Sequence, residues 1–145
     1  MKLYISVDME GLAGITNWKD ETEDRERFRN AMNEQVEWVL EGISKSKHNK
    51  EITHIYIADS HGGGQNLSYD RLNDKDESFD MVFLVGYHAG AGEVASSMDH
   101  TYSGASVQNV YINGQLMNEG TINSAYAGIV HKVPVGLIIG DSGLE

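Results

Sequence analysis

The feature that most constrains the fold is a change of hydrophobic period along the chain, because strand-like runs alternate with helix-like segments. Residues 2–8 alternate apolar with other side chains, which predicts a strand. From about residue 21 to residue 47 the apolar residues recur at spacings of three and four, which predicts an amphipathic helix. The same spacing predicts a second helix with one apolar face from about residue 121 to residue 130.

Three further runs complete the strand–helix alternation. Residues 52–58 predict a second strand, residues 79–85 a third and residues 133–139 a last one. The third is apolar almost throughout, as is typical of a sheet covered on both faces. The alternation therefore predicts an α/β fold, with a mainly parallel or mixed central sheet and helices on both faces.

Two segments fall outside this alternation. Residues 107–117 predict a hairpin, because Asn113-Gly114 is a strong two-residue turn sequence. We expect this hairpin to add a mixed edge to the sheet. Residues 67–78 are polar and without period, which predicts a loop.

Length and composition narrow the class of protein. A chain of 145 residues fits one domain over residues 1–145. No apolar run approaches the roughly 20 residues that cross a bilayer, and the N-terminus has no signal-peptide pattern, so we expect a cytoplasmic protein without a membrane partner. The absence of cysteine excludes disulfides and thiolate zinc sites. A net charge of −11 disfavours a nucleic-acid partner and attracts divalent cations.

Each of the first three predicted strands ends in side chains that can bind a metal ion. Asp8 and Glu10 follow the first strand, Asp59 and His61 the second, and His88 the third. Because the carboxyl ends of parallel strands share one edge of the sheet, these side chains are expected to lie close together. A mixed set of carboxylates and imidazoles suits zinc, whereas magnesium prefers oxygen alone.

One further residue fits this pattern, and several of the candidates also have simpler structural explanations. Glu119, at the entrance to the second helix, is placed to project toward the same edge, although it also complements a helix N-terminus. A strand-end Asp commonly forms a turn or caps a helix, and His61 beside glycines fits an ordinary loop. Asp59 is expected to order its loop, or to orient a ligand imidazole, rather than to bind metal. The joint placement on three strand ends favours the metal site.

His100 lies in a polar loop twelve residues after His88. A histidine near a metal can act as a base, a nucleophile or an oxyanion partner, and a solvent-exposed loop residue is an equal alternative. The remaining histidines have no such placement and are interpreted as surface or packing residues: His48, His54 and His131.

Several short segments, in this order, carry a resemblance to a known family. They are residues 6–11 (Ser-Val-Asp-Met-Glu-Gly), 59–61 (Asp-Ser-His), 86–89 (Gly-Tyr-His-Ala), 99–101 (Asp-His-Thr) and 119–125, which begins Glu-Gly. The ordered set spans nearly all of the chain and resembles the zinc-dependent D-aminopeptidase family, the DppA-type peptidases.

The resemblance implies both a site and an activity. It implies that two zinc ions per chain are held by five residues and that His100 stands where the family's proposed nucleophilic histidine lies. It also implies removal of N-terminal D-amino acids from short peptides and assembly into ring-like homo-oligomers, decamers among them. The five implied zinc ligands are Asp8, Glu10, His61, His88 and Glu119.

The chain departs from the family pattern in two places. Only 26 residues separate His61 from His88, where family members carry a longer stretch. Family members also continue well past the position of Gly140-Asp141 into a second region, whereas this chain ends soon after it. The two differences fit a deletion, an isolated domain or a sequence from which segments are missing, the family's C-terminal region among them. In each case we expect substrate specificity and assembly to be affected more than metal binding.

The resulting hypothesis is metal-assisted amide hydrolysis. A zinc pair would polarise the scissile carbonyl and lower the pKa of a water molecule from about 15.7 to about 7. His100 would act as nucleophile or oxyanion stabiliser, and we prefer the second role because the activated water already supplies the attacking oxygen. One rival is a dinuclear phosphoesterase or another amidohydrolase, although the motif loops have no arginine cluster to bind phosphate. Another is a non-catalytic metal-binding or assembly module of the same fold.

Overall fold

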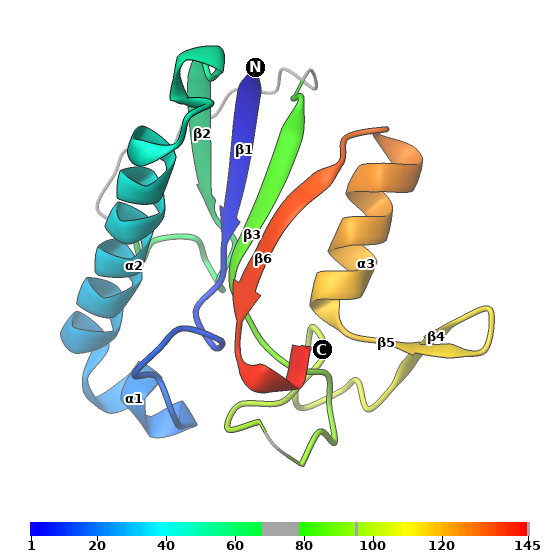
Figure 1. Ribbon diagram of the computed structural model, residues 1–145. Helices are drawn as coiled ribbons and strands as arrows, with labels where there is room; N and C mark the ends of the chain where they lie inside the picture. Colours follow the sequence, from blue (N-terminus) through cyan, green and yellow to red (C-terminus); the bar gives the residue numbers. More distant parts are fainter. Residues whose placement is uncertain (68–78, 95, 145) are drawn as a thin grey trace.

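A four-stranded parallel sheet organises the chain (Figure 1). The computed structural model describes residues 1–67, 79–94 and 96–144. The sheet has the order β2-β1-β3-β6, and each neighbouring pair is parallel. Its strands are β1 (Lys2–Val7), β2 (His54–Asp59), β3 (Met81–Tyr87) and β6 (Val135–Gly140). The four predicted strands are thus confirmed, with boundaries that differ by one or two residues.

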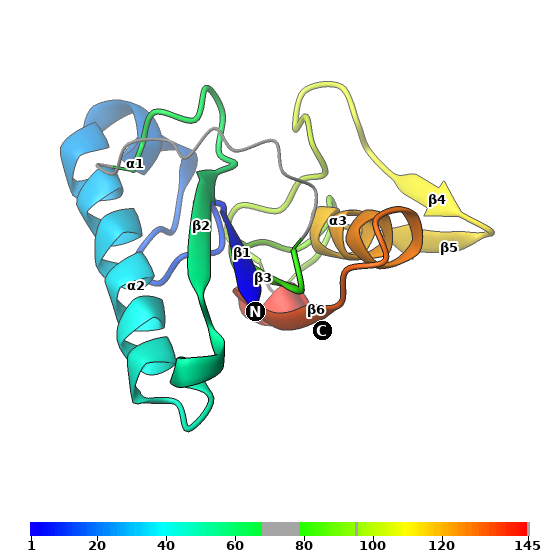
Figure 2. The ribbon, with the colours of Figure 1, turned by 90° about the horizontal axis from the view of Figure 1, so that it is seen from above.

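The two longest helical segments cover opposite faces of this sheet, as Figure 2 shows. On one face, α2 (Arg25–Lys45) buries its apolar stripe against β1, whose alternate side chains are fully buried. On the other face, Val82, Leu84 and Val133 form a second cluster with residues of the segment that follows α3 (Glu119–Ala125). The predicted α/β fold with helices on both faces is therefore confirmed.

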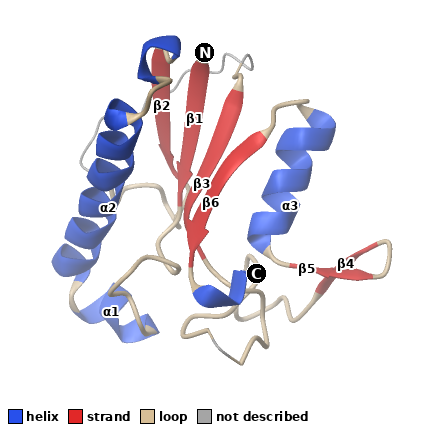
Figure 3. Ribbon diagram, viewed as in Figure 1, coloured by secondary structure: helices blue, strands red, loops and turns tan. Residues whose placement is uncertain are grey.

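The first predicted helix is two helices rather than one. A short helix, α1 (Trp18–Glu23), is capped by Asn17 and precedes α2. Asp24 separates them with non-helical backbone angles, and its side chain accepts a hydrogen bond from the Arg27 amide, which starts α2. After this break α1 runs at an angle to α2, at the level of the carboxyl end of the sheet and at the lower left of Figure 3.

The second predicted helix begins two residues earlier than expected, and its apolar face is less buried than expected. Asn118 and Thr121 form a reciprocal capping box that starts α3 at Glu119. The helix continues as a π-type turn, η2 (Tyr126–Val130). The face expected to be buried is largely exposed at its end, where Tyr126 and Ile129 are 58% and 68% exposed.

The predicted hairpin is present, but its place was wrong. It consists of β4 (Val110–Ile112) and β5 (Gln115–Met117), joined through Asn113 and Gly114, which both have positive φ as this turn requires. It forms a separate two-stranded sheet that projects beside α3 (Figure 1), so the central sheet is wholly parallel over the described residues.

The remaining elements are short. They are the 3-10 turns η1 (Asn49–Glu51), before β2, and η3 (Ser142–Leu144), after β6. The predicted loop at residues 67–78 lies, except for residue 67, outside the described residues. None of the helices in the described part of the chain is both long and apolar enough to cross a membrane.

Two glycines hold the ends of β1 and β3 in close contact. The Gly11 amide donates to the Gly86 carbonyl at 2.8 Å, and the Asp8 amide donates to the Val85 carbonyl at 2.8 Å. Gly86 has a φ of 75°, and a Cβ added there would lie 2.2 Å from the Asp8 carbonyl oxygen. Only glycine fits such an approach of two backbones. The segments that follow the two strands are therefore held together.

We expect Gly86→Ala to lower the free energy of unfolding by at least about 2 kcal/mol, because a left-handed backbone strain is added to a backbone clash. Urea unfolding measures the change. The matched control is Gly42→Ala in α2, where an added Cβ meets nothing within 4 Å. That change should raise stability by roughly 0.5–1 kcal/mol. Equal unfolding midpoints for Gly86→Ala and the unchanged protein would contradict this account.

Candidate metal centre

The carboxyl edge of the sheet gathers the predicted site residues into one buried cluster. Their exposed fractions range from 0% at His88 to 9% at His61 and Glu119. They come from the ends of three strands, from the loop after β3 and from the first turn of α3. The members are Asp8, Glu10, His61, His88, His100 and Glu119.

Asp8 lies between the two histidines of neighbouring strands. Its Oδ1 is 3.6 Å from His61 Nδ1, and its Oδ2 is 3.6 Å from His88 Nε2. β1 is paired with β2 on one side and with β3 on the other, so Asp8 has one histidine-bearing strand end on either side. Each carboxylate oxygen thus faces a different imidazole.

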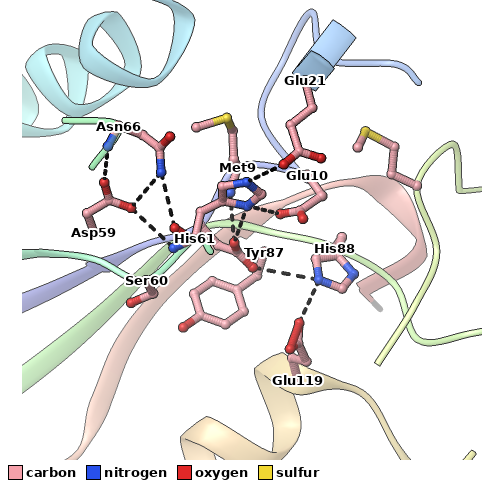
Figure 4. Close-up of polar contacts among 12 residues, drawn as sticks. Met9, Glu10, Glu21, Asp59, Ser60, His61, Asn66, Tyr87, His88 and Glu119 are labelled. Carbon is pink, nitrogen blue, oxygen red and sulfur yellow. Dashed lines mark hydrogen bonds and ion pairs between the residues drawn. The ribbon is translucent and has the colours of Figure 1, made fainter. Parts of the chain in front are cut away.

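A second carboxylate accompanies each histidine (Figure 4). Glu10 Oε2 is 3.0 Å from His61 Nδ1, and Glu119 Oε2 is 2.7 Å from His88 Nε2. The other oxygen of Glu119 accepts a hydrogen bond from the Tyr102 amide at 3.0 Å. The cluster therefore divides into two halves, each with an imidazole and a glutamate, which share Asp8.

His100 packs directly against this cluster. Its ring is stacked on that of His88, with centroids 3.9 Å apart and planes 5° from parallel, and its edge meets Trp18. Its Nδ1 lies 3.0 Å from the Met98 carbonyl, which accepts from it, while Nε2 faces Glu10 Oε1 at 3.8 Å. His100 is therefore a fixed and buried residue, not a solvent-exposed loop histidine.

The donor atoms are close enough to share cations. One ligand atom each from Asp8, Glu10 and His88 lie within 4.8 Å of one another, and the same is true of His88, His100 and Glu119. A mixture of buried imidazoles and carboxylates is the donor set that zinc prefers.

The cluster opens into a cavity of about 790 Å³. Carboxylates of Glu21 and Asp99 line it together with the indole of Trp18, and no lysine or arginine contributes to its described wall. The cavity is therefore acidic with one aromatic side. Such a wall attracts cationic groups and repels phosphate.

Comparison with known proteins agrees with this geometry. The sequence model of a family described as D-aminopeptidase matches residues 1–76 and 74–145. The chain belongs to the D-aminopeptidase family. The D-aminopeptidase of Bacillus subtilis (strain 168) is 29% identical over 164 aligned residues, which cover 97% of this chain and 56% of that protein.

A solved structure of a D-aminopeptidase matches in the same way. It is described as the Zn-dependent D-aminopeptidase DppA from Bacillus subtilis, a self-compartmentalizing protease. The TM-score is 0.80 at 29% identity, over 99% of this chain and 57% of the solved one. The family and fold predicted from the motifs are confirmed, and the chain spans little more than half the length of the relatives it matches.

Charge pairing dominates the electrostatics of this D-aminopeptidase-family site. Although burial opposes it, interactions with the carboxylates of Asp8 and Glu10 raise the pKa of His61 to about 11. Burial likewise opposes protonation of His88, but its contacts with Glu119 and the Ala89 carbonyl raise the pKa of that ring to about 9. In the metal-free protein both histidines are therefore cations at neutral pH, and their protons balance the buried carboxylates.

The pKa values of Asp8 and Glu10 are shifted in opposite directions. Burial raises the pKa of Asp8 above its ordinary value, and the neighbouring Glu10 adds to this. For Glu10, burial also favours the neutral form, but the hydrogen bond and charge of His61 outweigh it and lower the pKa of Glu10. The pKa values of the two carboxyl groups thus shift in opposite directions, because burial prevails at Asp8 and the interaction with His61 prevails at Glu10.

Asp59 orders the loop that carries His61, as expected from the sequence. Its carboxylate accepts from the backbone amides of His61, Asn66 and Leu67 at 3.2, 2.5 and 3.1 Å. In the described part of the chain its hydrogen-bond partners are these amides and the Asn66 side chain, not an imidazole. The three histidines read as surface or packing residues are exposed: His48, His54 and His131.

Two residues of the site were missed from the sequence. Trp18 and Glu21 both lie on α1, three residues apart and hence on one helical face. Trp18 meets the ring of His100, and Glu21 Oε1 lies 3.3 Å from His61 Nε2. The sequence signal for α1 was a pair of residues that commonly cap helices: Asn17, which caps α1, and Asp24, which caps α2.

We expect the metal-free protein to lose stability as pH rises from about 6.5 toward 9 and beyond. The unfolded histidines have a pKa of about 6.5, so the stabilisation from protonated His88 is complete below that pH and is lost as pH rises through about 9. His61 acts in the same direction up to about pH 11. Urea unfolding of chelator-treated protein at several pH values measures this.

Two controls accompany that experiment. His88→Gln should reduce the dependence of unfolding free energy on pH over this window, whereas exposed His48→Gln should leave it unchanged. Constant or rising stability of the metal-free protein between these pH values would show that the two histidines are not charged as described.

Proposed function

We propose that this chain is a metal-dependent aminopeptidase that hydrolyses short peptides with N-terminal D-amino acids through a two-zinc centre. The observation that carries this proposal is the position of Asp8, with one carboxylate oxygen toward each histidine and a glutamate beside each imidazole. The membership of the D-aminopeptidase family supports the reaction class, and a relative described as Zn-dependent supports the metal.

The donor set fits two ions that share one carboxylate. Glu10 and His61 would hold one ion together with Asp8 Oδ1. His88 and Glu119 would hold the other together with Asp8 Oδ2. When bound, zinc supplies polarisation of the scissile carbonyl and acidification of a water molecule.

His100 is proposed as the residue that stabilises the oxyanion of the tetrahedral intermediate. Its Nδ1 is engaged by the Met98 carbonyl, so only Nε2 is directed toward the site. Nε2 is thus the ring nitrogen that is free to donate to a developing oxyanion when it carries a hydrogen. Stacking on His88 fixes the ring in place, which suits a preorganised donor.

The acidic cavity supports a peptide with a free N-terminus as the substrate. The carboxylates of Glu21 and Asp99 attract an α-ammonium group, and Trp18 offers an apolar surface for a side chain. A phosphate ester would meet the same carboxylates unfavourably, which argues against the phosphoesterase alternative. The preference for D-amino acids rests on the family alone.

We also propose that the chain assembles into a ring-like homo-oligomer, of which a decamer is one form. A relative described as self-compartmentalizing supports this assembly. Exposed apolar side chains on the hairpin and on the end of η2 are consistent with contacts between copies. They are Tyr111, Leu116, Tyr126 and Ile129.

The second candidate function is a non-catalytic metal-binding or assembly module. The two functions differ in one measurable property, since a module would bind zinc and hydrolyse no peptide or amide.

We expect chelation to abolish hydrolysis of D-Ala peptides and added zinc to restore it, because the buried carboxylates and imidazoles are the proposed zinc ligands. Release of D-Ala from the peptide is followed by chromatography, and the L-Ala peptide and a phosphate ester serve as comparison substrates. Metal analysis of the same protein should give about two zinc ions per chain. Zinc binding with no hydrolysis of either peptide would favour the module instead.

Substitutions should separate metal binding from catalysis. Glu10→Ala is expected to lower both zinc content and rate, because it removes a proposed ligand. His100→Ala is expected to keep the zinc and to lower kcat by about 100-fold to 1,000-fold, the usual effect of removing an oxyanion donor. Exposed His48→Ala is the control. Loss of zinc from His100→Ala would make this residue a ligand, and full activity would remove it from the mechanism.

A further inference from the structure

α1 places a carboxylate on the outer side of the His61 ring. His61 Nδ1 faces the cluster, 3.0 Å from Glu10 Oε2 and 3.6 Å from Asp8 Oδ1. The opposite ring nitrogen, Nε2, lies 3.3 Å from Glu21 Oε1, as Figure 4 shows. The imidazole therefore stands between the cluster and a carboxylate from another element of the fold.

The two nitrogens of an imidazole have different roles when one of them binds a metal ion. A neutral ring carries one hydrogen, so a nitrogen that binds a metal ion leaves that hydrogen on the other nitrogen. In His61 the nitrogen that faces Asp8 and Glu10 is Nδ1, so Nε2 must carry the hydrogen. Glu21 is placed to accept it. A carboxylate in this position fixes the tautomer and the orientation of a ligand imidazole and makes it a better donor.

We propose that Glu21 is a positioning residue for the metal centre, which accepts the Nε2 hydrogen of His61 and directs Nδ1 toward Asp8 and Glu10. This inference rests on the proposed function, since it takes His61 to be a metal ligand. Glu21 is not itself a metal ligand in this role. It acts through the histidine.

The local structure holds α1 where this contact requires it. Asn17 accepts from the Lys19 amide at the start of the helix, and Asp20 pairs with Arg27 of α2 at 3.6 Å. Gln35 of α2 bonds both the amide and the carbonyl of Ala13, in the segment that leads to α1. The helix is thus tied to α2 on one side and contacts the site on the other.

Stability alone gives no reason for the Glu21 contact. The Glu21 side chain is 39% exposed, and ion pairs of this kind contribute little to the free energy of unfolding. Asp59, for which the sequence left open a role in orienting a ligand imidazole, is occupied by the backbone amides of its own loop. Glu21 therefore occupies the position that the sequence suggested for Asp59.

The test compares zinc affinity across variants of the full chain. Competition against a chromophoric chelator should show zinc binding weakened about 10-fold to 100-fold by Glu21→Ala. Glu21→Gln keeps an amide oxygen that accepts the same hydrogen, so it should restore most of the affinity. The matched control is Glu23→Ala, which removes the same charge from an exposed position of the same helix.

A second readout follows the tautomer directly. Nitrogen-15 NMR of the zinc-loaded protein should place the His61 hydrogen on Nε2, and the signal should broaden or shift in Glu21→Ala but not in Glu23→Ala. Glu21→Met, which keeps the side-chain length without the acceptor, repeats the test if the alanine variant folds poorly.

The outcomes distinguish this inference from the function on which it rests. Zinc affinity and a His61 signal that are equal in Glu21→Ala and Glu23→Ala would overturn the role of Glu21 while leaving the metal centre intact. Failure of the unchanged protein to bind zinc would overturn the proposed function, and this inference with it. Weakened binding in Glu21→Ala and Glu21→Met, with recovery in Glu21→Gln, supports the assignment.

Discussion

The position of the Asp8 carboxylate between two imidazoles is the constraint on which the rest of the site depends. β1 is an inner strand, so its end cannot move sideways without breaking the pairing with β2 or β3. A buried carboxylate is costly unless it is paired, and the two histidines that follow the neighbouring strands provide the pairing. The contact between Gly11 and Gly86 sets the spacing of the strand ends, and with it the distance between the two halves of the cluster.

The parallel arrangement made much of this predictable from the sequence. Alternating or continuous apolar runs located β1, β2 and β3, and the rule that parallel strands end at one edge was enough to bring Asp8, His61 and His88 together. Glu119 was predicted from its place at the start of a helix. The capping box of Asn118 and Thr121 starts α3 at this residue. His100 was found as a candidate, but its stacking on His88 depends on a loop without any period.

Other features depended on contacts that local patterns do not encode. From the sequence, Asp24 can either continue a single helix or cap a new one. Only the packing of α1 over the site determines that it caps α2. Glu21 was missed because its proposed role depends on a histidine forty residues away in the sequence. The hairpin sequence predicts its turn but not which sheet it joins. The exposure of Tyr126 and Ile129 shows that an apolar helical face does not by itself reveal what covers it.

The wide separation of the cluster residues along the chain has a consequence for how the protein folds. Asp8, His61, His88 and Glu119 meet only after β1, β2 and β3 have paired and α3 has docked, so the donors cannot surround a cation in an early, partly formed chain. A bound cation would then act on the finished molecule. It would slow unfolding far more than it speeds folding. The metal would therefore confer kinetic stability on the folded protein.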